Sequence, residues 1–507
     1  MPGSSSGNPD TGRIGFFNAE TQRGDPDRRT GQRIPTRMTK SFTRVVHPIA
    51  EGPQGPPARR DTYGSGENAI GRIPPGRFRK TNLAISEKKS ERDVMGRATL
   101  PPSGCNNFPL CVAGESLSRA PNAKGRNRLD RIFAHLRPAT CNFPLEIYNS
   151  APVDRYDYKG AVHVHSTYSD GKGGIEEIVA AANDAGLDFV VLTDHNTLAA
   201  AKDGHEKWHG STLLMVGAEI SPPDNHFVTF GDGALEGVEK LRESSPQEFI
   251  DATRRAGWLG FLAHPYYIGS KKVGGGSYKW MDWSVNGFTG LSIWSLLDDW
   301  KRQLDLENVT PGQAYDEFPK HLVGPDPEAL RKWDELSQHG RVVAIGEVDN
   351  HKMTRKYEER EYVIFPYEMA FRTITNHLLL DTPLSKKAPE AKRQVIEAFR
   401  KGSSYVSFDL ERDPTEFSAM IEHDEGHAFP GDEFTSGQED ELWVSLPEDA
   451  NIRVIRNGEV IKEDHSFELV VPIPEPGVYR VEVKHNSKPW ILTNAMHGRP
   501  PGDSHAA

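Results

Sequence analysis

The sequence predicts an α/β protein whose central part is a distorted, TIM-like (β/α)7 barrel, with a disordered N-terminal extension and a C-terminal β-sandwich-like module. Three observations support this fold class. Short apolar runs alternate with helix-like segments between residues 159 and 385, β-rich runs separated by turns occupy 410–495, and Gly, Pro, Ser and Arg dominate residues 1–128. Alternating strand and helix patterns are typical of a parallel sheet, and 507 residues allow about three such units.

The barrel strands are predicted from apolar runs of strand length. The runs are continuous rather than alternating, which is typical of strands buried on both faces. They cover residues 161–165, 189–195, 213–219, 226–231, 260–265, 290–295 and 342–351. Between the first two runs, apolar residues from Ile175 to Ala185 recur at helical spacing, and Gly186 ends the helix. Ser245 and Glu248 form a capping-box pattern at the start of a second helix over 245–258. Repetition of this strand and helix unit predicts a parallel sheet closed into a barrel.

The segments outside the barrel, residues 159–385, differ in composition. Residues 1–128 are rich in residues that break helices and strands, so we expect a disordered extension. A connecting segment over 129–158 holds a helix-like stretch from Leu129 to Pro138. After the barrel we expect a connecting helix and strand over 386–409, the β module over 410–495 and a tail over 496–507. Asn457 and Gly458 give the module its strongest hairpin signal.

Charge and cysteine content limit the possible functions. The formal net charge is −11, but residues 1–130 carry 22 Lys and Arg against 12 Asp and Glu, so the rest of the chain carries −21. Such an acidic body suits a cation-binding protein and argues against binding to long nucleic acids. The three cysteines argue against a disulfide framework. Because no apolar run has transmembrane length and no leader pattern is visible, we expect a cytoplasmic protein without membrane contact. The oligomeric state stays open.

Residues able to bind metal ions accompany six of the seven strand candidates. Parallel barrel strands bring their C-terminal ends to one rim, so these residues are expected to meet in one pocket. His163 and His165 would point to the same face of an extended strand because they are two residues apart. The candidate ligands are His163, His165, Asp170, His195, Glu219, His226, His264, Asp349 and His351.

The types of residue in this set indicate which metals it could bind. Imidazole and carboxylate ligands without thiolate favour zinc, manganese or iron. Glu219 lies near the middle of the set and is the natural carboxylate to bridge two ions. Taken singly, His226 and His264 are more often structural histidines, and Asp194 could cap a helix. The complete set at successive strands is not expected by chance.

Five motifs in this order, HVHSTYSDG, LTDHNT, GAEIS, AHP and DNH, resemble those of the PHP (polymerase and histidinol phosphatase) superfamily. The resemblance covers residues 159–351. The trailing β module, which ends in PWILTNA, is similar to the carbaryl-hydrolase-like (CehA/McbA-type) branch of that superfamily. The sixth strand departs from the pattern, because Ser292 stands where relatives often carry a carboxylate.

The resemblance implies a metal-dependent hydrolase with the PHP fold and two or three divalent cations. It implies that one ion is held by His163, His165, Glu219 and Asp349, a second by Glu219, His264 and His226, and a third by Asp170, His195 and His351. The ions would activate water as the nucleophile, with Glu219 and Asp194 as catalytic candidates. Asp194 would orient its neighbours rather than bind an ion.

The substrate is the least determined part of the prediction. The superfamily resemblance favours a small phosphoester, and the branch resemblance allows a carboxyl ester or a carbamate. A non-catalytic metal-binding or partner-binding protein is the alternative from another class, and a nuclease acting on short oligonucleotides is a further one. Lysines that could contact a phosphate are Lys172, Lys271, Lys272 and Lys352, each of which is more often solvated surface.

Two other groups of residues have competing interpretations. Trp280, Trp283, Trp294 and Trp300 could form an apolar wall for a leaving group, although core packing is the favoured interpretation. The acidic and histidine cluster at residues 422–427 resembles a metal site, but the Pro-Gly-Asp sequence that follows favours a surface turn.

Overall fold

The computed structural model describes residues 32–33, 155–306 and 308–502. Almost all of the expected disordered extension, and the helix expected from Leu129 to Pro138, lie outside these ranges. Within the extension, β1 (Gln32–Arg33) is described and pairs antiparallel with the start of β2 (Tyr156–Val164).

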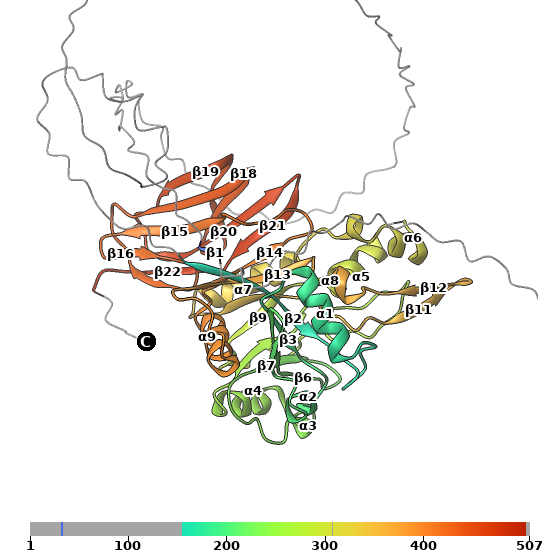
Figure 1. Cartoon of the computed structure of the whole chain (residues 1–507). Helices are drawn as coiled ribbons and strands as arrows, with labels where there is room; N and C mark the ends of the chain where they lie inside the picture. Colours follow the sequence, from blue (N-terminus) through green and yellow to red (C-terminus); the bar gives the residue numbers. More distant parts are fainter. Residues whose placement is uncertain (1–31, 34–154, 307, 503–507) are drawn as a thin grey trace, which may run out of the picture. The chain divides into compact units, whose positions relative to one another are not determined.

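Each of the seven predicted barrel strands is present, and the mixed α/β class is confirmed (Figure 1). Besides β2, these strands are β3 (Phe189–Leu192), β5 (Thr212–Val216) with β6 (Ala218–Ile220), β7 (Phe227–Phe230), β8 (Leu259–Leu262), β9 (Gly290–Ser295) and β10 (Val343–Glu347). All of their residues are buried except at the beginning of β2. Burial on both faces is what their continuous apolar sequence predicts.

These strands are divided between two sheets. The first sheet contains β2, β3 and β5, with β4 (Lys207–His209) at its edge, and the second has the order β10-β9-β8-β7-β6. Backbone contacts tie the two sheets together. The amide of His165 donates to the carbonyl of Asn350 over 3.0 Å, and a parallel bridge joins His195 to Glu219. Both edges of the second sheet are therefore attached to the first.

The prediction that all the strands are parallel is wrong for β7. This strand runs antiparallel to both β6 and β8. Only a short loop joins β6 to β7, so the strand and helix alternation also fails there. Hydrophobic content could not reveal the reversal, because a strand buried on both faces has the same apolar sequence in either direction.

Helices follow most of the other strands. They are α1 (Ile175–Ala185), α2 (Ala199–Lys202), α3 (Val238–Leu241), α4 (Pro246–Arg255), α5 (Leu296–Leu306), α6 (Pro311–Asp316), α7 (Pro327–Ser337) and α8 (Tyr367–Ala370), with a 3-10 turn, η1 (Phe318–His321). The predicted α1 ends at Gly186, whose φ of 74° suits glycine. The capping box of Ser245 and Glu248 starts α4 as predicted. A hairpin of β11 (Thr354–Tyr357) and β12 (Arg360–Val363) follows β10.

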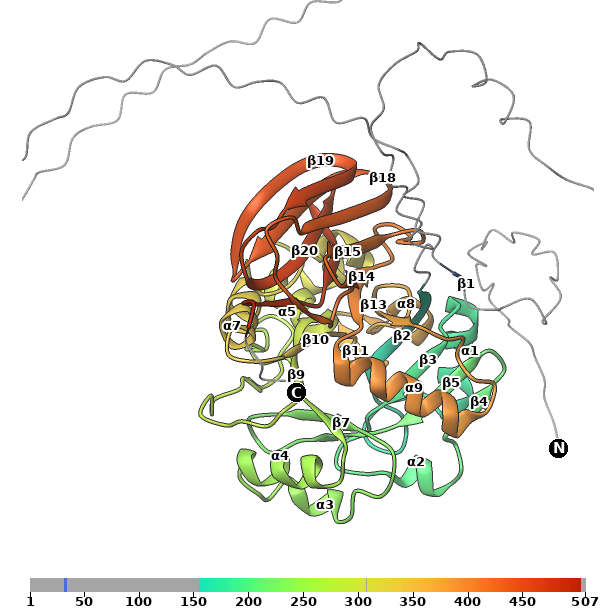
Figure 2. The same cartoon turned by 90° about the vertical axis from the view of Figure 1, so that its left-hand side faces the viewer.

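The connecting helix and strand expected over 386–409 are α9 (Ala388–Lys401) and β14 (Ser404–Phe408), which continue the first sheet together with β13 (Ile374–Leu380). Strand β13 lies within the range expected for the barrel and was not predicted. Strand β13 pairs with β2, and α9 contacts β13, β5 and β10 (Figure 2). Phe399 of α9 packs edge-on against Phe189, Phe230 and Phe261, with ring centroids 5.4–6.3 Å apart. These aromatic contacts attach α9 to the core between the strands.

The C-terminal module is a set of strands with its own apolar core. The strands are β15 (Ser418–His423), β16 (Gly426–Ala428), β17 (Glu433–Thr435), β18 (Glu441–Arg456), β19 (Glu459–Pro472), β20 (Gly477–His485), β21 (Lys488–Thr493) and β22 (Met496–Arg499). The pairs are antiparallel except β17 with β22, and the predicted Asn457-Gly458 hairpin joins β18 to β19. Through β21 and β14 they continue the first sheet, so the expected sandwich stays a prediction.

No helix within the described residues is long and apolar enough to cross a membrane.

Candidate metal centre

All nine predicted ligands lie together at one end of the two sheets. Their metal-capable atoms form overlapping groups in which all atoms lie within 4.8 Å of one another. Three of these groups are His165, Asp170, His195 and His351; then His163, His165 and Asp349; then Glu219, His226 and His264. These groups closely follow the three sets that the family resemblance implies.

A β-bulge directs the two histidines of β2. The register between β2 and β3 shifts at His163, whose φ of 70° lies in the left-handed region. An extended strand was therefore the wrong reason for His163 and His165 to converge. They do converge, with ring centroids 5.0 Å apart. Bulges of this kind turn a side chain toward a site, and backbone strain in a non-glycine residue is often found at functional positions.

Glu219 lies at the centre of the cluster and is 1% exposed. Its Oε2 lies 3.4 Å from Nε2 of His163 and 3.6 Å from Nε2 of His165. Its Oε1 lies 2.8 Å from Nδ1 of His226 and 3.3 Å from Nε2 of His264. Nδ1 of His195 also lies 2.8 Å from Oε2. The two oxygens of one carboxylate therefore face two different sets of histidines, as a bridging ligand requires.

His226 reaches the cluster because β7 runs backwards. It immediately precedes β7, whereas His195 and His264 follow the ends of β3 and β8. The N-terminal end of an antiparallel strand lies beside the C-terminal ends of its neighbours, so His226 lies at the same edge as they do. The strand that breaks the predicted topology thus supplies the ligand with the weakest sequence signal.

A third group lies toward the surface. Oδ1 of Asp170 is 3.5 Å from Nε2 of His195 and 3.3 Å from Nε2 of His351, and the Asp170 side chain is 56% exposed. The rings of His351 and His165 are stacked with centroids 3.9 Å apart, which links this outer group to the inner ones.

Asp194 holds the loop that carries Asp170. Its carboxylate accepts hydrogen bonds from the amide and hydroxyl of Ser166, at 2.8 and 2.7 Å, and from the hydroxyl of Ser169 at 2.6 Å. It is buried and belongs to none of the metal-capable groups found among the described residues. Its contacts are those of an orienting residue.

Glu347, at the end of β10, was missed from the sequence. Its Oε2 lies 3.0 Å from Nδ1 of His163, and its Oε1 accepts a 3.0 Å hydrogen bond from the amide of His264. It also forms a group with these two residues whose atoms could hold an ion. A carboxylate on Nδ1 of a histidine fixes the ring so that Nε2 presents its lone pair to a metal. The signal in the sequence was a glutamate inside an apolar strand, two residues before Asp349.

The carboxylates and histidines of the cluster shift one another's pKa values. Burial alone would raise the pKa of Glu219, but His163, His226 and His195 lower it well below its ordinary value. Burial and the neighbouring His351 hold the pKa of His165 well below its usual range. Burial opposes the charge on both His264 and His163, but Glu219 and Glu347 raise the pKa of His264 to about 9, and Glu219 also raises the pKa of His163. Divalent metals bind ionised carboxylates and neutral imidazoles, so a metal ion would displace the protons that these carboxylates stabilise on His163 and His264.

Buried atoms without a hydrogen bond test whether the residues fit a metal. Within the described part of the chain, Nε2 of His163, Nε2 of His165 and Oε2 of Glu219 are buried and accept or donate no hydrogen bond. Oε2 of Glu219 lies 3.4 Å from Nε2 of His163, 3.6 Å from Nε2 of His165 and 2.8 Å from Nδ1 of His195. Polar atoms are rarely buried without partners, and a cation between them would satisfy all three. The residues therefore fit a divalent metal.

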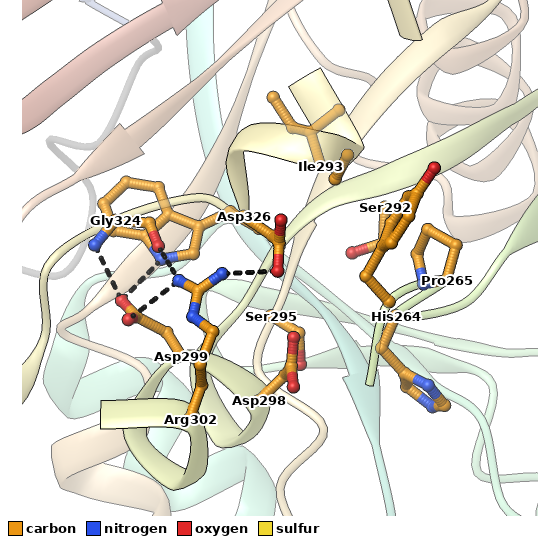
Figure 3. Close-up of a pocket in the computed structure, with 13 residues that line it drawn as sticks. His264, Pro265, Ser292, Ile293, Ser295, Asp298, Asp299, Arg302, Gly324 and Asp326 are labelled. Carbon is orange, nitrogen blue, oxygen red and sulfur yellow. Dashed lines mark hydrogen bonds and ion pairs between the residues drawn. The ribbon is translucent and has the colours of Figure 1, made fainter. Parts of the chain in front are cut away.

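A narrow polar pocket lies beside the cluster (Figure 3). His264 and Ser292 both line it, and Asp298 of α5 adds a buried carboxylate. Burial raises the pKa of Asp298 to about 7. Figure 3 also shows Arg302 paired with Asp299 and Asp326. Asp298 thus places a carboxylate in the pocket that Ser292 lines, from the helix that follows β9.

The remaining sequence candidates lie outside the centre. Lys172, Lys271 and Lys272 are exposed, and Lys352 pairs with Glu177. Trp280, Trp294 and Trp300 are core residues and Trp283 packs against that core, which agrees with the favoured interpretation, and Trp294 also lines the narrow pocket beside His264. Residues 422–427 form the β15–β16 hairpin and belong to none of the metal-capable groups of the described chain.

The fold and this centre define a mixed α/β protein with a histidine and carboxylate cluster suited to divalent metals. Residues 161–258 match the family model described as the PHP domain. That segment contains His163, His165, Asp170, His195, Glu219 and His226. The match supports the superfamily that the motifs indicate.

Solved structures give weaker likenesses. A two-domain protein from Bacteroides vulgatus, containing a predicted PHP-like metal-dependent phosphoesterase, is 14% identical, with 67% of this chain and 95% of that chain covered and a TM-score of 0.31. PsfC from Pseudomonas syringae is 10% identical, with 48% and 98% covered and a TM-score of 0.30. No curated protein sequence matches the chain. The family relationship therefore depends on the sequence match over residues 161–258.

Proposed function

We propose that this protein is a metal-dependent hydrolase of the PHP superfamily that cleaves a small phosphoester with a di- or trinuclear metal centre. The observation that carries the proposal is the position of Glu219. Its two oxygens face separate sets of histidines, and unpartnered buried atoms of His163 and His165 converge on one of them. We assign zinc, manganese or iron to this site from its imidazole and carboxylate ligands.

We further propose that the two sheets together make the distorted (β/α)7 barrel of the PHP fold. The bonds from β2 to the end of β10, and from the end of β3 to β6, support a closed ring of strands. The C-terminal module supports a place in the carbaryl-hydrolase-like branch only through its sequence similarity.

Several residues orient the candidate metal ligands. Glu347 fixes the ring of His163 and the backbone of His264. Ser221 contacts Nδ1 of His195 at 2.7 Å, while Nε2 of the same ring faces Asp170. Divalent cations held by these residues would supply an activated water and would offset negative charge in the transition state. No serine or cysteine nucleophile is needed, and we propose no covalent intermediate.

Turnover by the metal-loaded full chain tests the proposal. The protein is stripped with a chelator, reloaded with Mn²⁺ or Zn²⁺, and assayed on p-nitrophenyl phosphate, bis-p-nitrophenyl phosphate, p-nitrophenyl acetate and 1-naphthyl N-methylcarbamate. We expect metal-dependent hydrolysis of a phosphoester. Hydrolysis of the acetate or carbamate alone would favour the alternative ester hydrolase. Tight metal binding without any turnover would favour a non-catalytic protein.

A further inference from the structure

Two tyrosines form a wall beside the Glu219 side of the centre. Tyr267 lies with its ring centroid 5.4 Å from that of His264, and Tyr278 is stacked on His226 at 4.6 Å. The two tyrosine rings are themselves stacked at 5.6 Å, and the two histidine rings are 5.3 Å apart. The four rings therefore contact one another in a cycle. His226 and His264 are candidate metal ligands, and Tyr267 and Tyr278 are not.

A buried lysine completes this wall. Lys301 of α5 is 8% exposed, and its ammonium donates a hydrogen bond to the hydroxyl of Tyr267. The same nitrogen lies 5.1 Å from the centre of the Tyr267 ring. Among the described residues Lys301 forms no ion pair with a carboxylate, although Asp349 and Asp298 are near enough to influence its charge. A buried ammonium without a counter-ion is costly unless a ligand supplies the negative charge.

The loop between β8 and β9 is shaped to lie on this ammonium. A side chain at Gly275 would place its Cβ 3.0 Å from Nζ of Lys301 and 3.2 Å from the hydroxyl of Tyr267. The φ of Gly275 is 112°, which only glycine adopts readily. Gly275 is therefore required for two reasons, and both keep the loop in close contact with Lys301 and Tyr267.

The charges of the centre indicate which kind of ligand Lys301 would bind. Four carboxylates contact the clustered histidines: Asp170, Glu219, Glu347 and Asp349. Two divalent cations would balance these four charges, and a third would exceed them. Burial lowers the pKa of Lys301, Asp349 and Asp298 oppose this shift, and an anion beside the side chain would stabilise its charged form further. A neutral ester or carbamate cannot do this.

We propose that Lys301, positioned by Tyr267, is a substrate-binding residue that contacts a non-bridging oxygen of a phosphoryl group, and that it selects anionic phosphoesters over neutral esters. This inference rests on the proposed function. It assigns the substrate class of the same centre from residues that no sequence motif marked.

Inorganic phosphate is the direct probe. The zinc-loaded full chain is titrated with phosphate by calorimetry, and phosphate inhibition of phosphoester turnover is measured in parallel. Lys301→Met keeps the length and packing of the side chain and removes its charge. Lys240→Met, at an exposed position on α3, is the matched control.

We expect Lys301→Met to bind zinc as the parent does and to bind phosphate at least 10-fold more weakly. Its kcat/KM for p-nitrophenyl phosphate should fall by about 10²–10³-fold, the cost of removing one charged contact in an active site. Hydrolysis of p-nitrophenyl acetate, where present, should change less than threefold. Tyr267→Phe should produce a smaller loss with the same selectivity.

The outcomes separate the two proposals. If the parent binds phosphate through Lys301 but hydrolyses no phosphoester, the proposed function fails and the anion site stands. If the parent hydrolyses phosphoesters and Lys301→Met retains phosphate affinity and rate, the inference is wrong and the function stands. Equal losses on the phosphate and acetate substrates would also overturn it, because they would show a structural role. Metal content and the unfolding midpoint identify a variant that has simply failed to fold.

Discussion

Glu347 allows a sharp test of how the metal centre is held. In Glu347→Gln the side chain keeps its shape but has one acceptor oxygen in place of two. Both oxygens of Glu347 are engaged, with Oε1 accepting from the amide of His264 and Oε2 facing Nδ1 of His163. One of these contacts must therefore oppose an amide NH₂ group.

The backbone contact decides the orientation of the glutamine. The amide of His264 can only donate, so the glutamine oxygen remains there and its NH₂ group faces Nδ1 of His163. That nitrogen must then accept, which moves the ring proton to Nε2. An Nε2 that carries a proton has no lone pair for a metal ion.

The expected loss follows from this exchange of tautomers. Disturbing a residue that orients a metal ligand typically costs 10–100-fold in metal affinity or activity, and we expect Glu347→Gln to weaken the most sensitive zinc site by this factor. The loss equals about 1.4–2.7 kcal/mol of binding free energy. Competition with a chromophoric chelator measures the affinity directly.

A matched variant separates this effect from a general loss of charge. Glu335→Gln removes one negative charge from α7, where Glu335 pairs with Lys332 near the surface, and should leave zinc affinity unchanged. If Glu347→Gln binds zinc as tightly as the parent, then Glu347 does not set the tautomer of His163. A complete loss of folded protein would show instead that the residue serves the core.

Three other predictions concern the centre, the extension and the sheet. Glu219→Gln should lower both metal content and phosphoester turnover by at least 10–100-fold. His423→Ala in the β15–β16 hairpin should change neither. The reverse result would place the metal site in the C-terminal module. A chain that begins at residue 129 should fold and retain full activity, and loss of soluble protein would show that the N-terminal residues, including β1, are needed. His377→Asn should destabilise the fold at pH 6 by about 1.5–3 kcal/mol in denaturant unfolding, because Asp157 and Asp409 lose a charged hydrogen-bond partner. Asp409 keeps Lys159, and Asp157 keeps the hydroxyl of Tyr405. Burial opposes the charge on His377, but Asp157 and Asp409 raise its pKa to about 10, so this contribution is fully present below pH 6.5 and is lost as the pH rises through 10. A difference from the parent that is the same at pH 6 and pH 11 would contradict this account.

The positions of the strands could be predicted from the sequence, but their directions could not. The strands that contain Val190, Met215 and Phe261 carry apolar residues on both faces, and that pattern identifies a buried strand. The same pattern carries no direction, so β7 was wrongly placed parallel to its neighbours. The bulge at His163 was hidden for a similar reason, because nothing in HVH marks a residue with positive φ.

The clustering of the candidate ligands could be predicted because metals demand particular residue types, whereas the residues around them obey weaker rules. Glu347 was missed because the adjacent Asp349 and His351 already accounted for the motif. Lys301 was missed because it lies in a charged helix, and charged helical residues are usually solvated. Yet α5 buries Asp298, Asp299 and Lys301 together, and no periodicity distinguishes such a helix from a surface one.

This difference in what can be predicted follows from where each group lies. Most candidate metal ligands lie on a strand or within four residues of one end of it, and the apolar core holds these strands in place, so the sheets fix their spacing. Asp170, in the loop after β2, is the exception. Lys301, Tyr267 and Tyr278 belong to the connections around β9, where the backbone can vary without disturbing those strands. A change of substrate would therefore require changes in these connections and none in the ligands. The motifs at the strands therefore predict the metal-binding chemistry, whereas the proposed substrate preference depends on the β8–β9 loop and helix α5.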